Sequence, residues 1–411
     1  MGNKTGWIAL YGLALAFGLA IGMGFQAPLD PVTVLFRFLI LAAALLAVAL
    51  HLGEGGKRFA LFLWASLFAL LLCGANDLGM LFAASLSLGI ACFHLLRSGT
   101  FFAFFFGVAS LLFGSGILYG LTGSTRLGEI AERLGMGSPP AILASCLLMA
   151  GLGVMAILPP FHQWAADVAE KEAFSLEYFK LLVPPLAAFS AMLHLFPHAM
   201  GQARESWLLI LVACILLALL WASFMILAQR SLKGFLAFLS ISQFSFAFLG
   251  MAALRPGFLQ GIAASWIHLL ALSLALAGIA AVFASLDQTE LDSCQGLFHR
   301  SPWLGVSLTL CLLSLLGLPP MLGFWGKWFL FSETFAGGLS GLVLLAALSL
   351  VLPLYASSIL VRRIFWGKSK GEKLEAPFFS AIAIFSALSS IALFMLPSGL
   401  WSLGIRAAFG P

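Results

Sequence analysis

The residues of this sequence that could do chemistry are a few ionisable side chains set inside long apolar segments. The clearest case is Lys327, which lies in the segment Leu315–Phe331, LLGLPPMLGFWGKWFLF. Charged side chains within a membrane interior are costly, and they persist there mainly where they bind, pair or carry protons. The alternative is that Lys327 belongs to a loop between two helices and extends its amine to the membrane surface.

Two consecutive prolines, Pro319 and Pro320, interrupt the same segment. Proline lacks the backbone donor and clashes with the preceding turn, so a helix must break there. Within a membrane, broken backbone is tolerated only where it is buried in protein or lines a polar cavity. We therefore expect Lys327 to be held inside a helical bundle, close to the break.

A second Pro-Pro pair stands in a similar context 160 residues earlier. The runs Ile157–Asp167 (ILPPFHQWAAD) and Gly317–Lys327 (GLPPMLGFWGK) each place a charged residue seven positions past the second proline. Interrupted helices at matching positions in two halves are typical of transporters built from inverted repeats. The separation corresponds to about five spans, and an odd number implies that the repeats are inverted. In a chain with 17 prolines, such pairs also arise by chance.

The composition places these residues in a membrane. Hydrophobic residues make up 62% of the chain, charged residues only 9%, and the mean hydropathy is +1.08, whereas soluble domains carry roughly a quarter charged residues. The net charge of +5 is small and sits in loops, so it concerns topology rather than nucleic-acid binding. The cysteines and histidines lack metal-site spacing, and no glycine-rich phosphate loop is present. We expect no metal, nucleotide or redox cofactor to be bound directly.

Apolar segments suited to spanning about 30 Å of hydrocarbon predict the fold. They fall at about 6–25, 31–50, 58–74, 78–96, 101–121, 140–158, 174–196, 206–228, 234–253, 257–285, 302–335 (broken at the prolines), 339–361 and 376–397. The first resembles a signal peptide but lacks a small-residue cleavage site, so we keep it as a helix. We predict an all-α polytopic membrane protein of about 13 transmembrane helices with two inverted repeats, each containing a broken helix.

The same segments give the domain organisation. The chain 1–411 is expected to form a single transmembrane domain, with a first repeat at about 58–200 and a second at about 206–365. N-terminal helices in 1–52 and a C-terminal helix at 376–397 flank the repeats. With the N-terminus inside, thirteen loop lysines and arginines fall on the inner side and five on the outer side. Since cytoplasmic loops carry the positive excess, we expect a cytoplasmic N-terminus and an external C-terminus in a bacterial inner membrane.

Three stretches resemble the signatures of one family. They are Pro160–Asp167 (PFHQWAAD), Ala228–Gln243 (AQRSLKGFLAFLSISQ) and the long run Glu290–Phe331, which ends in SLLGLPPMLGFWGKWFLF. They are similar to motifs of the antiporter-like, proton-translocating membrane subunits of respiratory complex I, closest to the subunit N branch. That family usually has fourteen helices with both ends outside, so one helix fewer at the N-terminus agrees with the orientation given by the loop charges.

The resemblance implies that each half relays protons through buried lysines and acids. In the second half, Lys327, Lys233 and Gln229 match the family pattern, whereas Gln243 replaces a usual histidine. The resemblance therefore implies that the second half keeps much of its relay.

The first half departs from the family pattern. Where the family has a glutamate and two lysines, this chain has Leu86, Met155 and Pro185. A proton moves through titratable groups or along a file of water molecules, so we expect the first-half channel to have lost its proton relay. The alternative is a substitute relay of Lys180, His194 and Asp167.

Seven residues form the candidate proton path: Lys327, Lys233, His268, Glu333, Lys180, His162 and Asp167. Imidazole titrates near neutrality, so His268, within an apolar run, is a candidate relay group; alternatively it donates to a backbone carbonyl. His162 either carries protons or, with Trp164, stabilises the loop of the broken helix. Glu333 lies six residues after Lys327, off its helix face unless a break brings the two together.

The resemblance implies a non-catalytic membrane-arm subunit of a complex I-like NADH–quinone oxidoreductase, taking part in proton translocation coupled to quinone reduction. The other membrane-arm subunits and the lipid bilayer are the expected partners, and NADH and quinone are used by the parent complex. Alternatives with the same fold are a subunit of a cation/proton antiporter or of a membrane-bound hydrogenase, and a structural scaffold without proton transport. A stand-alone solute transporter would need polar midplane residues that the sequence lacks.

The orientation is testable with reporter fusions. A compartment-specific reporter fused after Arg363 should report the cytoplasm, and one fused at Arg126 the outer side, because the positive excess lies in the first set of loops. Reversed results at both positions would contradict the orientation and, since parity links them, the register of the inverted repeats.

Overall fold

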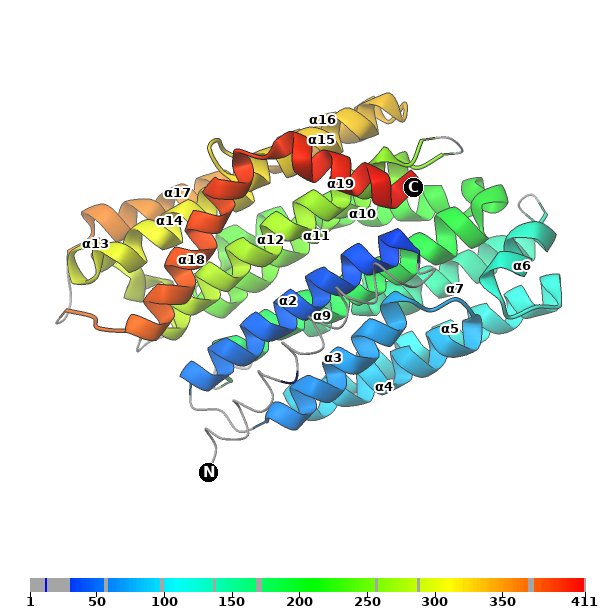
Figure 1. Ribbon diagram of the computed structural model, residues 1–411, viewed down its shortest axis with the longest axis horizontal. Helices are drawn as coiled ribbons and strands as arrows, with labels where there is room; N and C mark the ends of the chain where they lie inside the picture. Colours follow the sequence, from blue (N-terminus) through cyan, green and yellow to red (C-terminus); the bar gives the residue numbers. More distant parts are fainter. Residues whose placement is uncertain are drawn as a thin grey trace.

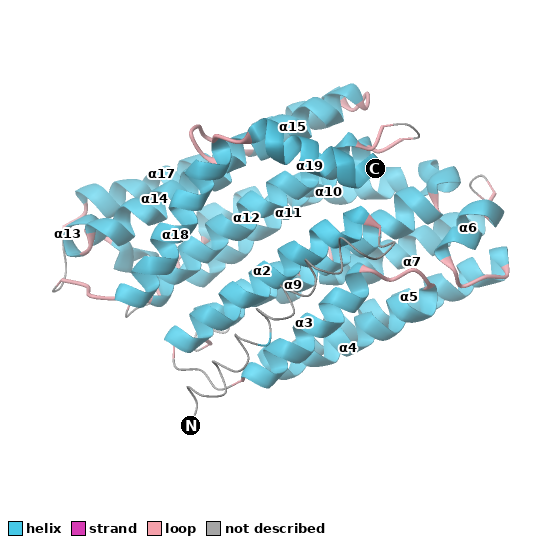
Figure 2. Cartoon of the chain, viewed as in Figure 1, coloured by secondary structure: helices cyan, strands magenta, loops and turns pink. Residues whose placement is uncertain are grey.

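The computed structural model describes residues 12, 30–54, 58–96, 100–135, 138–167, 172–255, 258–286, 289–368 and 373–409. Within these ranges the regular structure is helical, without strands (Figure 2). Nine of the described helices are long and apolar enough to cross a membrane, and three shorter apolar helices accompany them. The predicted all-α class is confirmed. The first predicted span, 6–25, lies outside the described residues.

Except for a helix at 397–409 that was not predicted, and for the division of the predicted span 339–361 into two helices, the larger helices lie close to the predicted positions. In chain order they are α2 (Pro31–Gly53), α3 (Phe59–Cys73), α4 (Leu78–Leu96), α5 (Thr100–Thr122), α7 (Pro139–Met155), α9 (Phe174–Leu193), α10 (Arg204–Ala228), α11 (Leu232–Ala253), α12 (Gln260–Ala284), α14 (Pro302–Leu316), α15 (Leu322–Ala336), α16 (Ser340–Ser349), α17 (Val351–Trp366), α18 (Pro377–Phe394) and α19 (Pro397–Phe409). Shorter pieces are α6 (Leu127–Arg133), α8 (Gln163–Ala166), the π-helical turn η1 (His194–Ala199), the 3₁₀ turns η2 (Gly201–Ala203) and η3 (Leu291–Cys294), and α13 (Leu297–Arg300). Several helices start with proline, whose missing N–H needs no partner in the first turn.

The helices from the middle of the chain form the core of the bundle. In Figure 1, α3 to α5 lie on one flank and α13 to α18 on the other, with α2, α9, α11 and α12 between them. Every residue of α9 and of α11 is buried. A helix that is apolar on all sides belongs in the interior of a large bundle. Polar residues on these helices are therefore cut off from the surroundings of the protein.

The helix before the second Pro-Pro pair ends in a defined motif. Gly317 follows α14 with φ +78°, and its N–H donates to the Ser314 carbonyl at 3.0 Å. The N–H of Leu318 donates to the Leu313 carbonyl, also at 3.0 Å. This is the Schellman arrangement, which satisfies carbonyls at a helix end and favours glycine at the left-handed position.

The helix before the first Pro-Pro pair ends in the same way, but without glycine. Ile157 follows α7 with φ +49°, and its N–H donates to the Val154 carbonyl at 3.3 Å. The N–H of Leu158 donates to the Gly153 carbonyl at 2.9 Å. A β-branched residue is an outlier in this region of backbone space. The two interruptions predicted from the prolines are both present, and they share their backbone motif.

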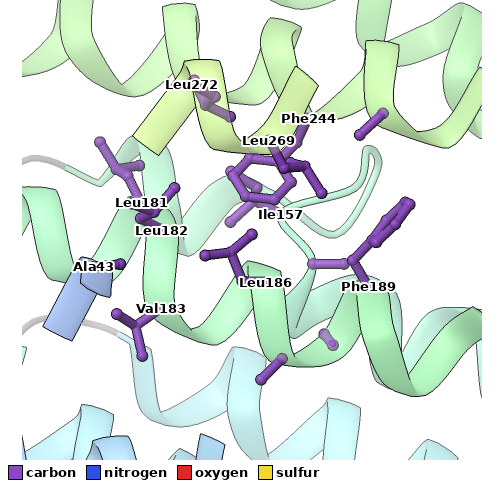
Figure 3. Close-up of a cluster of buried hydrophobic side chains, with 14 of the residues drawn as sticks. Ala43, Ile157, Leu181, Leu182, Val183, Leu186, Phe189, Phe244, Leu269 and Leu272 are labelled. Atoms are coloured by element: carbon purple, nitrogen blue, oxygen red, sulfur yellow. The ribbon is translucent and has the colours of Figure 1, made fainter. Parts of the chain in front are cut away.

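Packing explains why an isoleucine stands in this position. The Ile157 side chain is fully buried, and Figure 3 shows it among Leu186 of α9, Phe244 of α11 and Leu269 of α12. The left-handed conformation costs about 1–3 kcal/mol, whereas truncating a buried isoleucine costs about 2–5 kcal/mol. The side chain therefore contributes more to stability than its conformation costs.

A substitution series at Ile157 tests this balance. Ile157→Gly removes the backbone cost but leaves a cavity, so we expect the free energy of unfolding to fall by about 1–2 kcal/mol. Ile157→Ala keeps most of the backbone cost as well, and should be less stable than Ile157→Gly. Thermal unfolding of the purified protein gives the order. A glycine variant at least as stable as the native protein would show that strain dominates.

Candidate functional site

Lys327 is buried at the point where three helices meet. Its side chain leaves the second turn of α15, which begins after the break at the prolines, and the residue is 4% exposed. Nζ donates to Gln243 Oε1 of α11 and to the Leu315 carbonyl of α14, both at 2.6 Å. The ammonium also lies 4.9 Å from the centroid of the Phe246 ring, within the range of a cation–π contact. The loop alternative for Lys327 is therefore wrong.

The break in the helix supplies one of these acceptors. The last carbonyls of a helix have no partner within it, and they form the negative end of the helix dipole. Leu315 belongs to the last turn of α14, and its carbonyl turns to Lys327 instead of to a further helical N–H. The interruption and the lysine thus belong to one local structure.

His268 of α12 adjoins Lys327 and shares Gln243 with it. The residue is 2% exposed, and its Nε2 lies 2.9 Å from the backbone carbonyl of Gln243. Helices α12 and α15 approach closely at Gly326, where an added Cβ would lie only 2.8 Å from the His268 Cα. The predicted hydrogen bond from His268 to a carbonyl is confirmed. We call Lys327, Gln243 and His268 the Lys327 site.

The hydrogen bond to the Gln243 carbonyl determines which ring nitrogen of His268 carries the hydrogen. A carbonyl oxygen only accepts, so Nε2 carries the hydrogen and Nδ1 is the basic nitrogen of the ring. Within the described part of the chain, neither His268 Nδ1 nor Gln243 Nε2 has a hydrogen-bond partner, although both are buried. Buried polar atoms of this kind commonly bind water. The site can therefore accept and donate beyond the bonds it already makes.

Lys233 lies on the same helix as Gln243 but at its far end. It is in the first turn of α11, is buried, and donates to the Glu172 carbonyl. Its ammonium is 5.3 Å from the centroid of the Phe174 ring. Ten residues of helix separate Lys233 from Gln243, about 15 Å along the axis. Lys233 and Lys327 are therefore not in contact, but one buried helix connects them.

Lys180 forms a buried ion pair. Its Nζ lies 2.7 Å from Glu177 Oε2, and the two side chains are 2% and 1% exposed. Lys180 also donates to the backbone carbonyl of Asp167 at 3.2 Å. Glu177 was not among the candidates predicted from the sequence, although its i,i+3 spacing to Lys180 on a helix was a usable signal.

The remaining candidates take no part in the Lys327 site. Glu333 is partly exposed, and α15 continues unbroken past Lys327, so the two side chains leave different faces. Asp167 is exposed and borders a surface cavity of about 520 Å³. His162 is buried just before α8, and Trp164 Nε1 donates to the Val154 carbonyl at 2.6 Å. The expected role of Trp164 in stabilising the loop is confirmed.

The first half is apolar where a relay would be expected. Met155 is buried at the end of α7, and Pro185 lies inside α9. Leu86 is exposed and lines an apolar groove of about 340 Å³ between α4 and α5. Figure 3 shows that the middle of α9 carries hydrocarbon side chains, including Leu181, Leu182, Val183 and Phe189.

The substitute relay of Lys180, His194 and Asp167 is not assembled. His194 lies at the opposite end of α9 from Lys180, about 21 Å away at 1.5 Å per residue, and no ionisable residue stands between them in that helix. His194 Nε2 instead lies 3.0 Å from Thr33 Oγ1 and 3.6 Å from Asp30 Oδ2. Asp167 meets Lys180 through its backbone carbonyl only.

Comparison with known proteins shows to which family this chain belongs. The structure defines a polytopic helical membrane protein with a buried lysine beside an interrupted helix. Residues 96–353 match the family described as NADH:quinone oxidoreductase/Mrp antiporter, TM. The chain belongs to this family, and the resemblance seen in its motifs is confirmed.

Individual relatives agree along most of the chain. NAD(P)H-quinone oxidoreductase subunit 2 of Synechococcus elongatus is 33% identical over 351 residues, which cover 79% of this chain and 67% of that protein. NADH-quinone oxidoreductase subunit N of Protochlamydia amoebophila is 31% identical over 389 residues, 89% of this chain and 80% of that protein. A chain of respiratory complex I from Thermus thermophilus superposes with a TM-score of 0.83 at 28% identity, covering 98% of this chain and 94% of its own.

Gly317 provides a test of how tightly Lys327 is held. A Cβ there would lie 2.7 Å from Lys327 Cδ, and the residue also has φ +78°. Gly338 has φ +84° but open space around it, so Gly338→Ala carries the backbone cost alone. We expect Gly317→Ala to lower the free energy of unfolding by about 1–3 kcal/mol more than Gly338→Ala, measured by thermal unfolding. Equal losses would show that Lys327 has room to move.

Proposed function

We propose that this chain is a membrane-arm subunit of a complex I-like NADH–quinone oxidoreductase, most like subunit N, which moves protons through its second half. The single observation that carries the proposal is the Lys327 site. A lysine is buried at a helix break, hydrogen-bonded to uncharged acceptors, with a histidine beside it. An ionisable group at membrane depth is functional by default.

The chemistry of the site suits reversible protonation. Gln243 Oε1 and the Leu315 carbonyl can accept from Lys327 but carry no full negative charge. Burial disfavours a charged lysine, and no carboxylate opposes that effect within the site. His268 Nδ1, which is buried and has no hydrogen-bond partner among the described residues, offers a second basic atom in the site. A proton can therefore arrive at and leave Lys327 without separating an ion pair.

The first half is proposed to lack a relay at the family positions. Leu86, Met155 and Pro185 provide no titratable group, so this half contributes packing rather than its own channel. We further propose that the chain 1–411 is one domain of thirteen spans with inverted repeats at about 58–200 and 206–365. The matching backbone motifs at Ile157 and Gly317 support this internal correspondence.

The proposed partners and membrane location of the chain are based on its named relatives. We propose that the other membrane-arm subunits and the lipid bilayer contact this chain, in a bacterial inner membrane, with the N-terminus in the cytoplasm and the C-terminus outside. The names of the relatives, quinone oxidoreductase subunits, support this assignment. No redox cofactor is proposed to bind here, since NADH and quinone would be used by other parts of the complex.

The second candidate is a subunit of a cation/proton antiporter, because the family description includes the Mrp antiporter. A subunit of a membrane-bound hydrogenase is a variant of that candidate. A scaffold without proton transport is favoured only by the apolar first half. Identifying the proteins that copurify with this chain distinguishes the antiporter subunit and the hydrogenase subunit from the main proposal.

Substitution of Lys327 decides between pump and scaffold. Lys327→Met keeps similar volume without charge, so we expect the complex to assemble but to move fewer protons per electron pair, because the relay loses its buried base. Proton pumping by reconstituted complex, with electron transfer measured in the same vesicles, gives the ratio. An unchanged ratio in fully assembled complex would favour the scaffold.

Met155→Lys is the converse variant in the first half. It places the lysine expected from the family at a buried position, but Leu86 offers no partner charge there. An unpaired buried charge costs several kcal/mol, so we expect lower stability and no gain in pumping. A gain in the proton ratio would contradict the proposal that this half has lost its relay.

A further inference from the structure

Five ionisable residues lie together at the beginning of α9, outside the Lys327 site. They are Glu54, which follows α2, Glu172, which precedes α9, Glu177 and Lys180 within α9, and Lys233 at the start of α11. Electrostatic interaction reaches Lys233 from each of the other four. We call this group the α9 cluster. It contains three acids and two bases, and Arg58 and His51 border it.

The contacts of the cluster are tight and shielded. Lys180 pairs with Glu177 at 2.7 Å, where both side chains are almost completely buried. Lys233, on the neighbouring helix, donates to the backbone carbonyl of Glu172. The charges thus come from three separate parts of the chain. Glu177, Lys180 and Lys233 are buried, whereas Glu54 and Glu172 are partly exposed.

One member of the cluster has an evident structural role. The Glu54 carboxylate accepts from the N–H groups of Phe174 at 2.7 Å and of Ser175 at 3.1 Å. These are orphan donors at the start of α9, and an acid at a helix N-terminus is stabilising. His51 adds a contact of 2.9 Å between its Nδ1 and Ser175 Oγ. Neither Glu177 nor Lys180 is needed to complete this cap.

Burial makes two acids of the cluster easier to protonate, against the effect of their hydrogen bonds and of the neighbouring cations. Burial raises the pKa of the Glu54 carboxyl above its ordinary value, against the effect of its hydrogen bonds to Ser175 and Phe174. Burial also raises the pKa of Glu172, and the negative charge of Glu177 adds to the effect, while Arg58, Lys180 and Lys233 oppose it. Protonation of either acid is thus favoured relative to an exposed carboxylate.

Helix α11 leads from the cluster to the Lys327 site. Lys233 stands in its first turn, Ser240 lies two turns further on nearly the same face, and Gln243 follows three residues later. All three are buried. The distance from Lys233 to Gln243, about 15 Å along the helix, requires a chain of water molecules in addition to the Ser240 hydroxyl. No other ionisable residue of α11 lies along this path.

We propose that the α9 cluster is the proton-loading site for the Lys327 site, in place of the acid and lysines absent from the first half. Glu177 is the acid that receives the proton, and Lys233 is the group that passes one on toward Gln243 and Lys327. This inference rests on the proposed proton-translocating function of the second half.

The exchange balances in protons and charge. An incoming proton forms an O–H bond on Glu177, which removes the charge that balances Lys180. Lys233 gives a proton to the water chain along α11, and an N–H bond of Lys180 breaks to reprotonate Lys233. Transfer of the carboxyl proton of Glu177 to the neutral amine of Lys180 then restores the ion pair. One proton has entered and one has left.

A purely structural ion pair is the competing explanation. Buried ion pairs add little to stability relative to apolar residues of similar volume, but removing one partner alone is strongly destabilising. A structural pair should therefore be replaceable as a unit. A loading site should not, because the titrating atoms are lost with it.

The test replaces the pair as a unit in the assembled complex. Glu177→Gln/Lys180→Met removes both charges at similar volume, and we expect assembly to persist while the number of protons pumped per electron pair falls as far as in Lys327→Met. Combining the double variant with Lys327→Met should cause no further loss, because the two sites act in series. Glu129→Gln, in an exposed surface ion-pair group with Arg126 and Arg133, is the control and should pump normally.

The outcomes separate this inference from the proposed function. Normal pumping by the assembled double variant, with reduced pumping by Lys327→Met, overturns the loading site and leaves the proposed function intact. Normal pumping by both overturns the proposed function and the loading site together. If the double variant does not assemble, Glu177→Asp decides: a shifted pH dependence of pumping supports the loading site, and an unchanged one overturns it.

Discussion

The structure of the second half depends on one constraint. A backbone or side-chain polar group that lies inside an apolar bundle must be hydrogen-bonded within the protein, because the surrounding hydrocarbon offers it no partner. The last turn of α14 leaves carbonyls without a helical N–H partner, and three of them are hydrogen-bonded elsewhere. The turn at Gly317 satisfies those of Leu313 and Ser314, and Lys327 takes that of Leu315. The lysine in turn needs acceptors because it is buried. The break without the lysine would leave a carbonyl unpaired, and the lysine without the break would lose one of its two acceptors.

Helix α11 extends this constraint across the bundle. Because it is buried along its whole length, any polar side chain on it must be paired inside the protein. Gln243 accepts hydrogen bonds through two different groups: its side-chain oxygen accepts from Lys327, and its backbone carbonyl accepts from His268. Lys233 finds a backbone carbonyl at the other end. The same helix therefore holds two polar regions in fixed positions relative to each other.

Much of the fold could be predicted from the sequence, since apolar length and Pro-Pro pairs act locally. Most of the helix positions, both interruptions, the burial of Lys327 and the carbonyl contact of His268 belong to this group, whereas the break between α16 and α17 and the helix α19 do not. The partners of the buried charges could not be predicted. Glu54 meets α9 about 120 residues later in the chain, and Lys327 meets Gln243 across 84 residues of sequence. Glu177 was missed although it lies within the predicted span 174–196, because the sequence alone does not show that the beginning of α9 is buried on every side.

Lys180 of the α9 cluster and Lys327 are held in physically different ways, and the difference bears on what each can do. Lys180 faces a carboxylate, so losing its proton would leave Glu177 buried as an uncompensated anion, which is strongly unfavourable. It can give up a proton only when another reaches its partner. Lys327 faces an amide oxygen and a backbone carbonyl, so losing its proton costs two hydrogen bonds and leaves no buried anion. A site of the first kind exchanges protons one for one, and a site of the second kind can change its own charge. In the proposed arrangement, the α9 cluster lies at the beginning of α11 and is locked until a proton arrives, and Lys327 contacts the middle of α11 at Gln243 and can be charged and discharged.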